Sequence, residues 1–399
     1  MTTPTRTGLL DTAALRLVDH HALHGDLPPA DASVLTAYAG LTGRGGAGFP
    51  TAVKLRSVAE AAARTGRSPV VVANGAEGEP AAAKDRMILT RAPHLVLDGI
   101  AVVARTLGAT AAVLAVDADL VPALRARLAE RDSRPDVRLH PVPRSFLAGE
   151  ETALVAAVDG GVPLPRGKVP PVRVRGVAGA PTLVLNVETL ARLALLARGE
   201  HGAADRTLVT RHVDVAGVVR VDVLETGLGV PMGELLPLDD GVQAVLVGGY
   251  HGTWVAAPVA RSVSLDRTSL SAVGASLGAG VLAALPSDRC GVRETASITG
   301  YLARESAGQC GPCLNGLPRI VAALQLLARP VAPPPTLLDD VRRWAGLVVG
   351  RGACSHPDGT VRLVASALRV FAGEFEVHRH GRCTASSAQP FLPTTGGPR

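Results

Sequence analysis

Apolar runs of strand length alternate with helical stretches through the first half of the chain, and this alternation constrains the fold most strongly. Residues 69–75 (PVVVANG) and 111–117 (AAVLAVD) have the length and composition of buried strands, and a stretch of helical length follows each. Strands that alternate with helices usually form a layered α/β structure. We therefore predict an α/β domain over residues 1–205, with a proline-rich loop at 162–176.

The rest of the chain has two other patterns. Residues 206–285 contain short β-type runs separated by Gly and Pro, which predicts a small β-rich or α+β module. From about residue 290 the pattern is helical, and we expect one long helix to follow Cys354. The apolar positions of this helix are Val361, Val364, Leu368, Phe371 and Phe375. Residues 384–399 are predicted to be a disordered tail.

Composition and charge indicate where the protein is located and what kind of partner it binds. The longest uncharged apolar run, residues 106–116, is too short to cross a bilayer, so we expect a cytoplasmic protein without direct membrane insertion. Five cysteines, an odd number, argue against a disulfide framework. The net charge of +6 indicates a solvated arginine-rich surface or the binding surface of an acidic partner. The solvated surface is the preferred interpretation, and of the two acidic partners a small electron carrier is preferred over a nucleic acid, because no nucleic-acid-binding module is evident.

Three cysteines have the spacing of a metal site. Cys310 and Cys313 form a Cys-x-x-Cys pair between two helical segments, and Cys354 lies just before the last predicted helix. An antiparallel helical bundle would bring Cys354 back beside the pair. Thiolates bind soft metals, so zinc or an iron–sulfur cluster is expected.

The other two cysteines are poorly placed to join this site. If the intervening segment is helical, Cys290 lies roughly 30 Å from Cys310. Cys383 lies at the far end of the last predicted helix. We therefore interpret Cys290 and Cys383 as incidental thiols.

A glycine-rich loop at residues 41–56 (LTGRGGAGFPTAVKLR) matches G-x-G-x-x-G at Gly43, Gly45 and Gly48. A dinucleotide fingerprint requires a preceding strand, whereas residues 31–40 look helical, so the Rossmann interpretation is disfavoured. Several glycines still allow backbone N–H groups to close around a phosphate, and Lys54 adds a positive charge. The alternative is a flexible loop without a ligand.

Further polar groups stand at the ends of the predicted elements. Asn74 and Glu77 follow the first strand, Glu150 and Glu151 begin a helix, and Asn186 precedes another helix. Each such group alone is usually a solvated helix cap. Their recurrence in sequence order favours a ligand-binding site, which in α/β sheets lies at the ends of the strands.

These motifs together resemble the NADH-binding flavoprotein subunit of respiratory complex I and the related diaphorase and formate dehydrogenase subunits. The resemblance covers residues 35–380 and rests most on ESAGQCGPCLNGLPRI, CSHPDGTV and ALRVFAGEFEVH. It implies an FMN-binding α/β domain, a ubiquitin-like, soluble-ligand-binding β-grasp module over 206–285, and a helical iron–sulfur domain over 286–383. Phe49 would face the nicotinamide of NAD(H). The residues that would surround FMN are Gly43, Arg44, Gly45, Gly46, Gly48, Lys54, Asn74, Glu77, Gly149, Glu150, Glu151 and Asn186.

The resemblance also implies a [4Fe–4S] cluster, held in the family by Cys-x-x-Cys-x-x-Cys and one distant cysteine. Cys310, Cys313 and Cys354 match three of these ligands, and Ala307 stands in place of the fourth. Water, Ser306 or His356 are candidates for the open position, or the cluster holds three irons.

The sequence departs from the family pattern around the flavin and nicotinamide. Ala76, Ala81 and Leu185 replace polar or glycine residues, and Ser57 and Val172 stand where aromatic side chains would stack on NADH. Each lost aromatic contact weakens binding by roughly 0.5–1.5 kcal/mol. The leading hypothesis is an oxidoreductase component that passes electrons between NAD(H) or a ferredoxin and the cluster. The alternatives are a catalytically degenerate iron–sulfur scaffold and a zinc-stabilised helical bundle.

Overall fold

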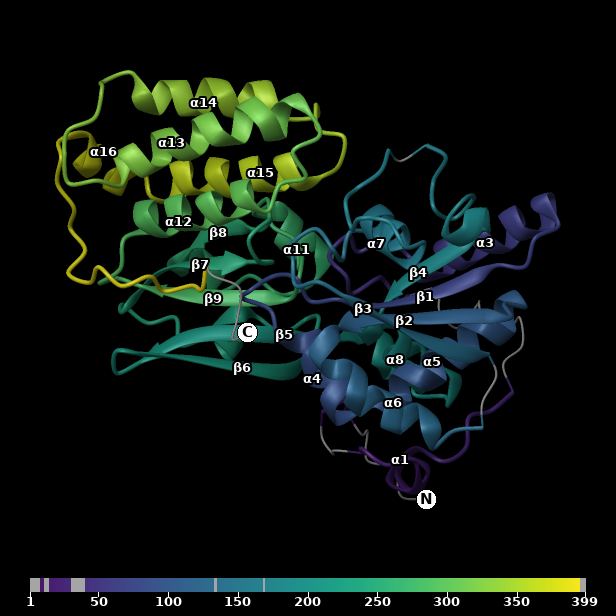
Figure 1. The fold of residues 1–399 in the computed structure, drawn as a ribbon. Helices are drawn as coiled ribbons and strands as arrows, with labels where there is room; N and C mark the ends of the chain where they lie inside the picture. Colours follow the sequence, from purple (N-terminus) through teal and green to yellow (C-terminus); the bar gives the residue numbers. More distant parts are fainter. Residues whose placement is uncertain (1–7, 11–13, 30–39, 133–134, 168, 395–399) are drawn as a thin grey trace.

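The computed structural model describes residues 8–394 except 11–13, 30–39, 133–134 and 168. Two sheets lie side by side along the molecule, and helices cover both (Figure 1). The first sheet comes from the first half of the chain, and the second comes from residues after 205.

The first sheet is entirely parallel, which confirms the predicted α/β architecture. Its strand order is β3-β2-β1-β4, and the two strands predicted from the sequence are β1 and β2. The bounds are β1 (Val70–Gly75), β2 (Ala111–Asp117), β3 (Asp136–Val142) and β4 (Thr182–Asn186). Both faces are covered by helices, and accordingly all five residues of β4 and four of the six residues of β1 are buried.

Helices flank this sheet on both faces. Helix α7 (Glu151–Val158) packs on one face, and α5 (Pro93–Leu107) and α8 (Val187–Ala197) pack on the other, where α3 (Thr51–Thr65) joins the same hydrophobic core (Figure 1). A Cβ atom on Gly99 of α5 would be 2.0 Å from the Leu190 carbonyl oxygen of α8, so glycine permits the close packing of these helices. The remaining elements are α1 (Leu17–His24), α4 (Lys84–Arg91), η1 (Ala118–Leu120), α6 (Val121–Ala129), η2 (Val177–Gly179) and η3 (His201–Asp205).

The second sheet is mixed and has the order β6-β5-β9-β7-β8. Its central neighbours β5 and β9 are parallel, and the other pairs are antiparallel. The strands are β5 (Arg206–Val215), β6 (Val218–Gly227), β7 (Val242–Val247), β8 (Thr253–Ala256) and β9 (Val281–Pro286). One face packs against the short helices α9 (Met232–Leu235), α10 (Ala257–Ala260) and α11 (Arg267–Ala272).

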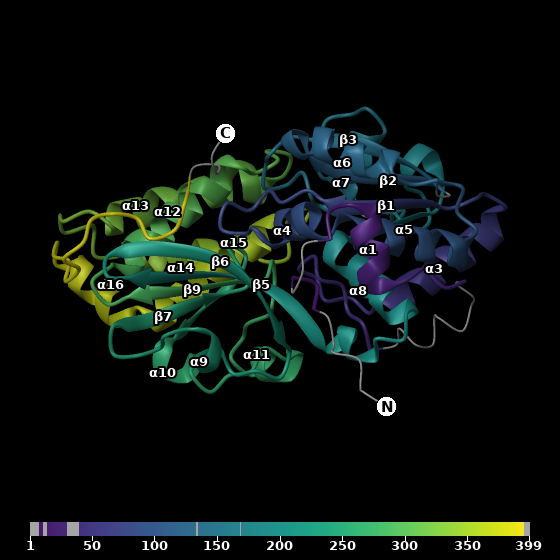
Figure 2. The same ribbon diagram turned by 90° about the horizontal axis from the view of Figure 1, so that it is seen from below.

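The C-terminal helices cover the other face of the second sheet (Figures 1 and 2). Trp254 of β8 is fully buried beneath them, where its ring contacts Phe371 and its backbone N–H donates to Ser366 Oγ at 2.9 Å. The sheet and the helices therefore share one hydrophobic core. The helices are α12 (Gly291–Arg304), the π-helical turn η4 (Pro312–Gly316), α13 (Leu317–Leu327), α14 (Leu337–Val348), α15 (His356–Val370) and α16 (Ala372–Arg379).

Two sequence-based expectations about the C-terminal part are wrong. The long helix after Cys354 is two helices, since α15 ends where Phe371 leaves helical geometry (φ −103°, ψ 28°). The segment 384–394 is not a disordered tail, because Phe391 and Leu392 are buried and the Phe391 N–H donates to the Glu294 carboxylate at 2.5 Å. Residues 395–399 lie outside the described part of the chain.

No single helix in the described part of the chain is long and apolar enough to cross a membrane. One bent pair of helices, α4 with α5, together has the length and the apolar composition of a membrane span. Both members are core helices, and α5 is buried over most of its length.

A half-buried glutamate joins the two sheets. Glu79 follows β1, and its Oε1 accepts a hydrogen bond of 2.8 Å from the backbone N–H of Tyr250, between β7 and β8. Any Cβ on Gly249 would lie 2.1 Å from Glu79 Oε1, so this contact needs glycine. Burial raises the pKa of Glu79 to about 8, and the nearby Glu77 adds to the shift.

This raised pKa predicts that the protein loses stability as the pH rises. The contribution of Glu79 is full below its ordinary pKa of 4.5 and is lost as the pH passes through about 8. Glu79→Gln keeps an acceptor for Tyr250 and cannot ionise. The free energy of unfolding, measured with urea from about pH 5 to pH 8, should therefore fall less in the variant than in the wild type. Equal slopes would contradict this assignment.

Candidate functional site

The glycine-rich loop is closed at its base like a short hairpin. The Gly43 N–H donates to the Phe49 carbonyl at 2.9 Å, and the Thr51 N–H donates to the Leu41 carbonyl at 2.9 Å, where α3 begins. Gly46 and Gly48 have φ angles of 106° and 58°, which favour glycine. Phe49 is 51% exposed at the loop's end. The helical segment expected before the loop falls on residues 31–39, outside the described residues.

The loop meets the carboxyl ends of the parallel strands. A Cβ on Gly45 would lie 3.2 Å from Asn186 Cβ at the end of β4, and Asn186 pairs in register with Asn74 of β1. Asn74 Nδ2 donates to the Gly149 carbonyl at 2.8 Å. Four of the predicted site residues, far apart in the sequence, therefore lie together at the edge of the sheet where α/β proteins bind ligands.

Lys54 contributes a positive charge beside this edge. It lies on the first turn of α3, and its Nζ is 2.6 Å from Glu151 Oε1 and 2.7 Å from the Val184 carbonyl oxygen. Ser57 lies one turn further along α3, and its hydroxyl donates to the Val53 carbonyl. A serine hydroxyl therefore stands one turn from Lys54, where the family resemblance implies an aromatic side chain.

Two predicted carboxylates serve as helix caps. Glu150 Oε2 accepts hydrogen bonds from the backbone N–H groups of Thr152 and Ala153 at 2.9 and 3.0 Å, so it caps α7. Glu77 accepts from the backbone N–H groups at the start of α4, each at 3.0 Å. Burial and the neighbouring Asp85 raise the pKa of Glu77 to about 7. Both side chains are committed to local structure.

The predicted residue Arg44 also points into the fold. Its buried guanidinium donates to the carbonyls of Ala204 and Arg206 at 2.7 and 3.1 Å, and burial lowers its pKa to about 10. Its backbone N–H donates to Thr189 Oγ1 at 2.9 Å, so Arg44 fastens the loop to α8 and to the start of β5.

A buried ionic network, absent from the predicted site, supports Asn186. Lys84 Nζ lies 2.6 Å from Asp85 Oδ1 and 3.2 Å from Glu188 Oε2, and Asn186 Nδ2 donates to Asp85 Oδ2 at 2.7 Å. Burial opposes the charge, but both carboxylates raise the pKa of Lys84. The sequence shows these residues at the starts of helices, but their burial depends on the packing of α4 against α8.

The three predicted cluster cysteines converge at the turn between α12 and α13. Backbone N–H groups of Gly308 and Ala353 bond to the sulfurs of Cys313 and Cys310, respectively. Burial, Cys310 and Cys354 raise the pKa of Cys313 to about 11. Convergent thiols with N–H···S bonds fit an iron–sulfur cluster, whose potential depends on such bonds.

The structure does not support His356 as a fourth ligand. Its Nε2 bonds to the Leu302 carbonyl at 2.8 Å and its Nδ1 lies 3.1 Å from His251 Nε2, so both ring nitrogens are engaged in a buried position. Ala307 offers no donor atom. Ser306, at the end of α12, is partly exposed.

Cys290 and Cys383, which the sequence suggested are incidental thiols, lie outside the three-cysteine site. They lie together, with the Cys290 sulfur 3.2 Å from His378 Nε2. The break at Phe371 causes this, because it lets α16 turn the chain back toward the start of α12.

One contact, made by Phe146, connects the region of the glycine-rich loop with the region of the three cysteines. Phe146, three residues before Gly149, donates its N–H to Glu305 Oε2 at 2.8 Å, near the end of α12. The Phe146 ring also contacts the ring of His356, two residues after Cys354, at 5.6 Å between centroids. The two predicted cofactor sites are therefore directly connected through the protein.

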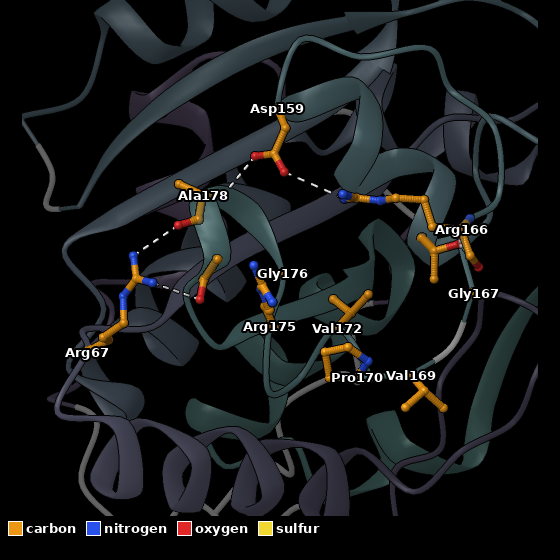
Figure 3. A pocket seen from close by; sticks show the side chains of 12 residues that line it. Arg67, Asp159, Arg166, Gly167, Val169, Pro170, Val172, Arg175, Gly176 and Ala178 are labelled. Atoms are coloured by element: carbon orange, nitrogen blue, oxygen red, sulfur yellow. Dashed lines mark hydrogen bonds and ion pairs between the residues drawn. The ribbon is translucent and has the colours of Figure 1, made fainter.

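A cavity of about 720 Å³ lies beside α7, away from the glycine loop (Figure 3). Arg67 and Arg166 face it, and Figure 3 shows them bonded to the Ala178 carbonyl and to Asp159. Among the predicted or replaced site residues, only Val172 lines it. The remaining lining residues are Thr152, Gly167, Val169, Pro170, Arg175, Gly176 and Gly179.

Two family models match the chain. Residues 36–195 match the Nuo51 FMN-binding domain, and residues 293–378 match the NADH-ubiquinone oxidoreductase-F iron–sulfur binding region. The NADH-quinone oxidoreductase F 2 subunit of Rhizobium meliloti (strain 1021) is 30% identical over 89% of this chain and 90% of the relative. This chain belongs to the family of NADH-quinone oxidoreductase F subunits. The family resemblance seen in the sequence is thereby confirmed.

Other similar proteins agree. The NADH-quinone oxidoreductase F subunit of Streptomyces coelicolor is 29% identical over 89% of this chain and 84% of its own length. A chain of an NAD⁺-reducing [NiFe]-hydrogenase, solved in the H2-reduced state, superposes with a TM-score of 0.79 and 27% identity, over 98% of this chain and 68% of that one. The FMN-binding match includes every predicted flavin residue, and the iron–sulfur match includes Cys310, Cys313 and Cys354.

The cysteine geometry predicts how iron content responds to substitution. Cys313→Ser removes a buried thiolate, so iron per chain in anaerobically purified protein should fall nearly to zero. Ala307→Cys adds a fourth thiolate and should slow the loss of iron in air. Cys383→Ser, which removes a thiol outside this set of three, is the matched control and should leave iron unchanged. Full iron in Cys313→Ser would contradict the assignment.

Proposed function

We propose that this F-type flavoprotein exchanges electrons with NAD(H) through FMN and passes them to an iron–sulfur cluster within a larger oxidoreductase complex. FMN would supply two-electron exchange with the nicotinamide and one-electron exchange with the cluster. The observation that carries the proposal is the contact of Phe146 with Glu305 and His356, which joins the two sites.

The residues at the strand ends fit FMN. The N–H groups of Gly43 and Arg44 already donate to Phe49 and Thr189, so we propose that the part of the loop from Gly45 to Gly48 cradles the flavin and that Asn74, Gly149 and Asn186 border it. A bound flavin would compete with Glu151 for Lys54, and the ammonium would favour the negative charge of the reduced flavin. Arg44, Glu77 and Glu150, whose side chains are engaged elsewhere, would hold the loop and the helix starts that border the flavin. Phe49, exposed beside the loop, would face the nicotinamide.

Cys310, Cys313 and Cys354 would hold the cluster, which we propose is [4Fe–4S] with a non-cysteine ligand at its fourth iron. The N–H···S bonds from Gly308 and Ala353 would help to set its potential. A zinc ion bound by these three cysteines is disfavoured. A zinc site needs ligand atoms that lie close together. Within the described residues, only Cys290, His378 and Cys383 have their His, Cys, Asp or Glu ligand atoms within 4.8 Å of one another.

We propose three structural units that match the predicted division: the FMN domain over 1–205, a β-grasp module over 206–285 and a helical bundle over 286–383. The parallel pairing of the module's first and last strands, β5 and β9, at the centre of its sheet supports the β-grasp assignment. The stacked helices α12–α16 support the bundle.

The comparisons do not favour the degenerate scaffold, since similarity extends over 89% of the chain. Several departures from the family are also accommodated by packing. Leu185 is buried in the core, and the buried Ala81 carbonyl bonds to His212 Nε2 at 2.8 Å. Val172 is 5% exposed. We therefore propose that NADH binds with fewer stacking contacts than in aromatic-containing relatives.

The proposed partners are other electron-carrying subunits or an acidic ferredoxin. The names of the relatives support this, because they are subunits of an NADH-quinone oxidoreductase and a chain of an NAD⁺-reducing hydrogenase. None of the five cysteines, all in the described part of the chain, forms a disulfide, which suits the proposed cytoplasmic location.

The proposed function predicts NADH oxidation by the FMN-reconstituted protein with ferricyanide as acceptor. Lys54→Met should weaken FMN binding about tenfold, or ~1.4 kcal/mol, because it removes the cation beside the site. FMN fluorescence quenching measures the affinity. Lys54→Arg keeps the charge and is the control. Protein that binds FMN but does not oxidise NADH would point to another electron donor, and protein that binds no FMN would refute the proposal.

A further inference from the structure

A second cluster of metal-ligating side chains lies at the end of the helical layer far from the parallel sheet. Cys290 precedes α12, His378 lies in the last turn of α16, and Cys383 follows α16. Figure 1 shows α16 and the C-terminal segment at this outer end. The iron–sulfur family match begins at residue 293 and ends at 378, so both cysteines lie outside it.

The spacing of these three side chains suits a single metal ion. Their ligand atoms all lie within 4.8 Å of one another, and Cys290 Sγ is 3.2 Å from His378 Nε2. A tetrahedral zinc ion with Zn–S of about 2.3 Å and Zn–N of about 2.0 Å separates its ligand atoms by roughly 3.5–3.8 Å. Shifts of a fraction of an ångström to about one ångström would therefore bring all three into coordination.

His378 is oriented as a metal ligand. Its Nδ1 lies 2.9 Å from the Leu327 carbonyl oxygen, so the proton belongs on Nδ1 and the lone pair of Nε2 faces Cys290. Histidines that bind metals usually donate the other ring N–H to a carbonyl or carboxylate in this way. The imidazole is buried, so its orientation is fixed before a metal binds.

Glu374 provides a fourth group. It lies on α16, its side chain bonds to Cys290, and its Oε2 accepts from the Gly291 N–H at 2.8 Å. Two thiolates, one imidazole and one carboxylate or water form a typical donor set for Zn²⁺. We propose that Cys290, His378 and Cys383 bind one Zn²⁺ ion, with Glu374 or water completing the tetrahedron and two thiol protons released on binding.

The zinc ion would fix the C-terminal segment to the helical layer. After Cys383 the chain runs along the start of α12, where the Ser387 N–H donates to the Asp288 carbonyl at 3.0 Å and Arg289 donates to the Gln389 carbonyl at 2.7 Å. Beyond these contacts, Phe391 and Leu392 enter the core. A metal bound by Cys290 and Cys383 would cross-link the two ends of this domain, as structural zinc sites do.

Metal analysis of the full-length chain, purified anaerobically and equilibrated with Zn²⁺, tests the proposal. We expect one zinc per chain in addition to the iron. Cys383→Ser, at a partly exposed position, should lose the zinc and keep the iron. Cys310→Ser is the matched control and should lose iron while keeping the zinc. His378→Gln should lose zinc like Cys383→Ser.

The zinc K-edge X-ray absorption of the wild-type protein gives a readout that needs no variant. It should show two sulfur ligands at about 2.3 Å and two nitrogen or oxygen ligands at about 2.0 Å. Zinc retained in Cys383→Ser, zinc lost only in Cys310→Ser, or no bound zinc in the wild type would overturn the proposal. None of these results bears on FMN or NADH, so the proposed function is tested separately.

Discussion

The hydrogen bond from the Phe146 N–H to Glu305 is the contact on which the arrangement of the two cofactor sites depends. On one side, the chain continues from Phe146 to Gly149, against Asn74 at the strand ends. On the other, it continues from Glu305 to the cysteine turn. Electron transfer between bound groups depends steeply on distance, so a fixed junction is required. The rings of Phe146 and His356 reinforce it with a second, independent contact.

Glycine allows the backbones at this junction to approach closely. A Cβ on Gly78 would lie 2.1 Å from the Ser145 carbonyl oxygen, beside Phe146. The Gly78 carbonyl in turn accepts a hydrogen bond from the Tyr301 hydroxyl of α12 at 3.4 Å. Gly249 has the same role at the contact between Glu79 and the second sheet. The two halves of the molecule therefore pack through backbone contacts that larger residues would prevent.

Local sequence patterns predicted the parts of the structure that local forces determine. The apolar run 69–75 is β1, and the spacing of Cys310, Cys313 and Cys354 brings their sulfurs together because helices connect them. The patterns failed where tertiary packing decides. Phe371 interrupts the last helix, and its ring packs against Gly291 and Trp254. That break brought Cys383 to Cys290, and no sequence periodicity reveals it. Likewise, the position of Glu150 in the sequence fits both a ligand-binding carboxylate and a helix cap. Only the structure shows that its side chain caps α7.

The most direct test of the account is rapid-freeze EPR of anaerobic, FMN- and iron-loaded protein mixed with NADH, with flavin absorbance followed in parallel. The account predicts that the flavin absorbance bleaches and that the reduced-cluster signal develops in the same molecules within a turnover. The contradicting result is a bleached flavin beside a cluster that stays oxidised although dithionite reduces it. In that case, the junction at Phe146 would not connect the two sites electronically.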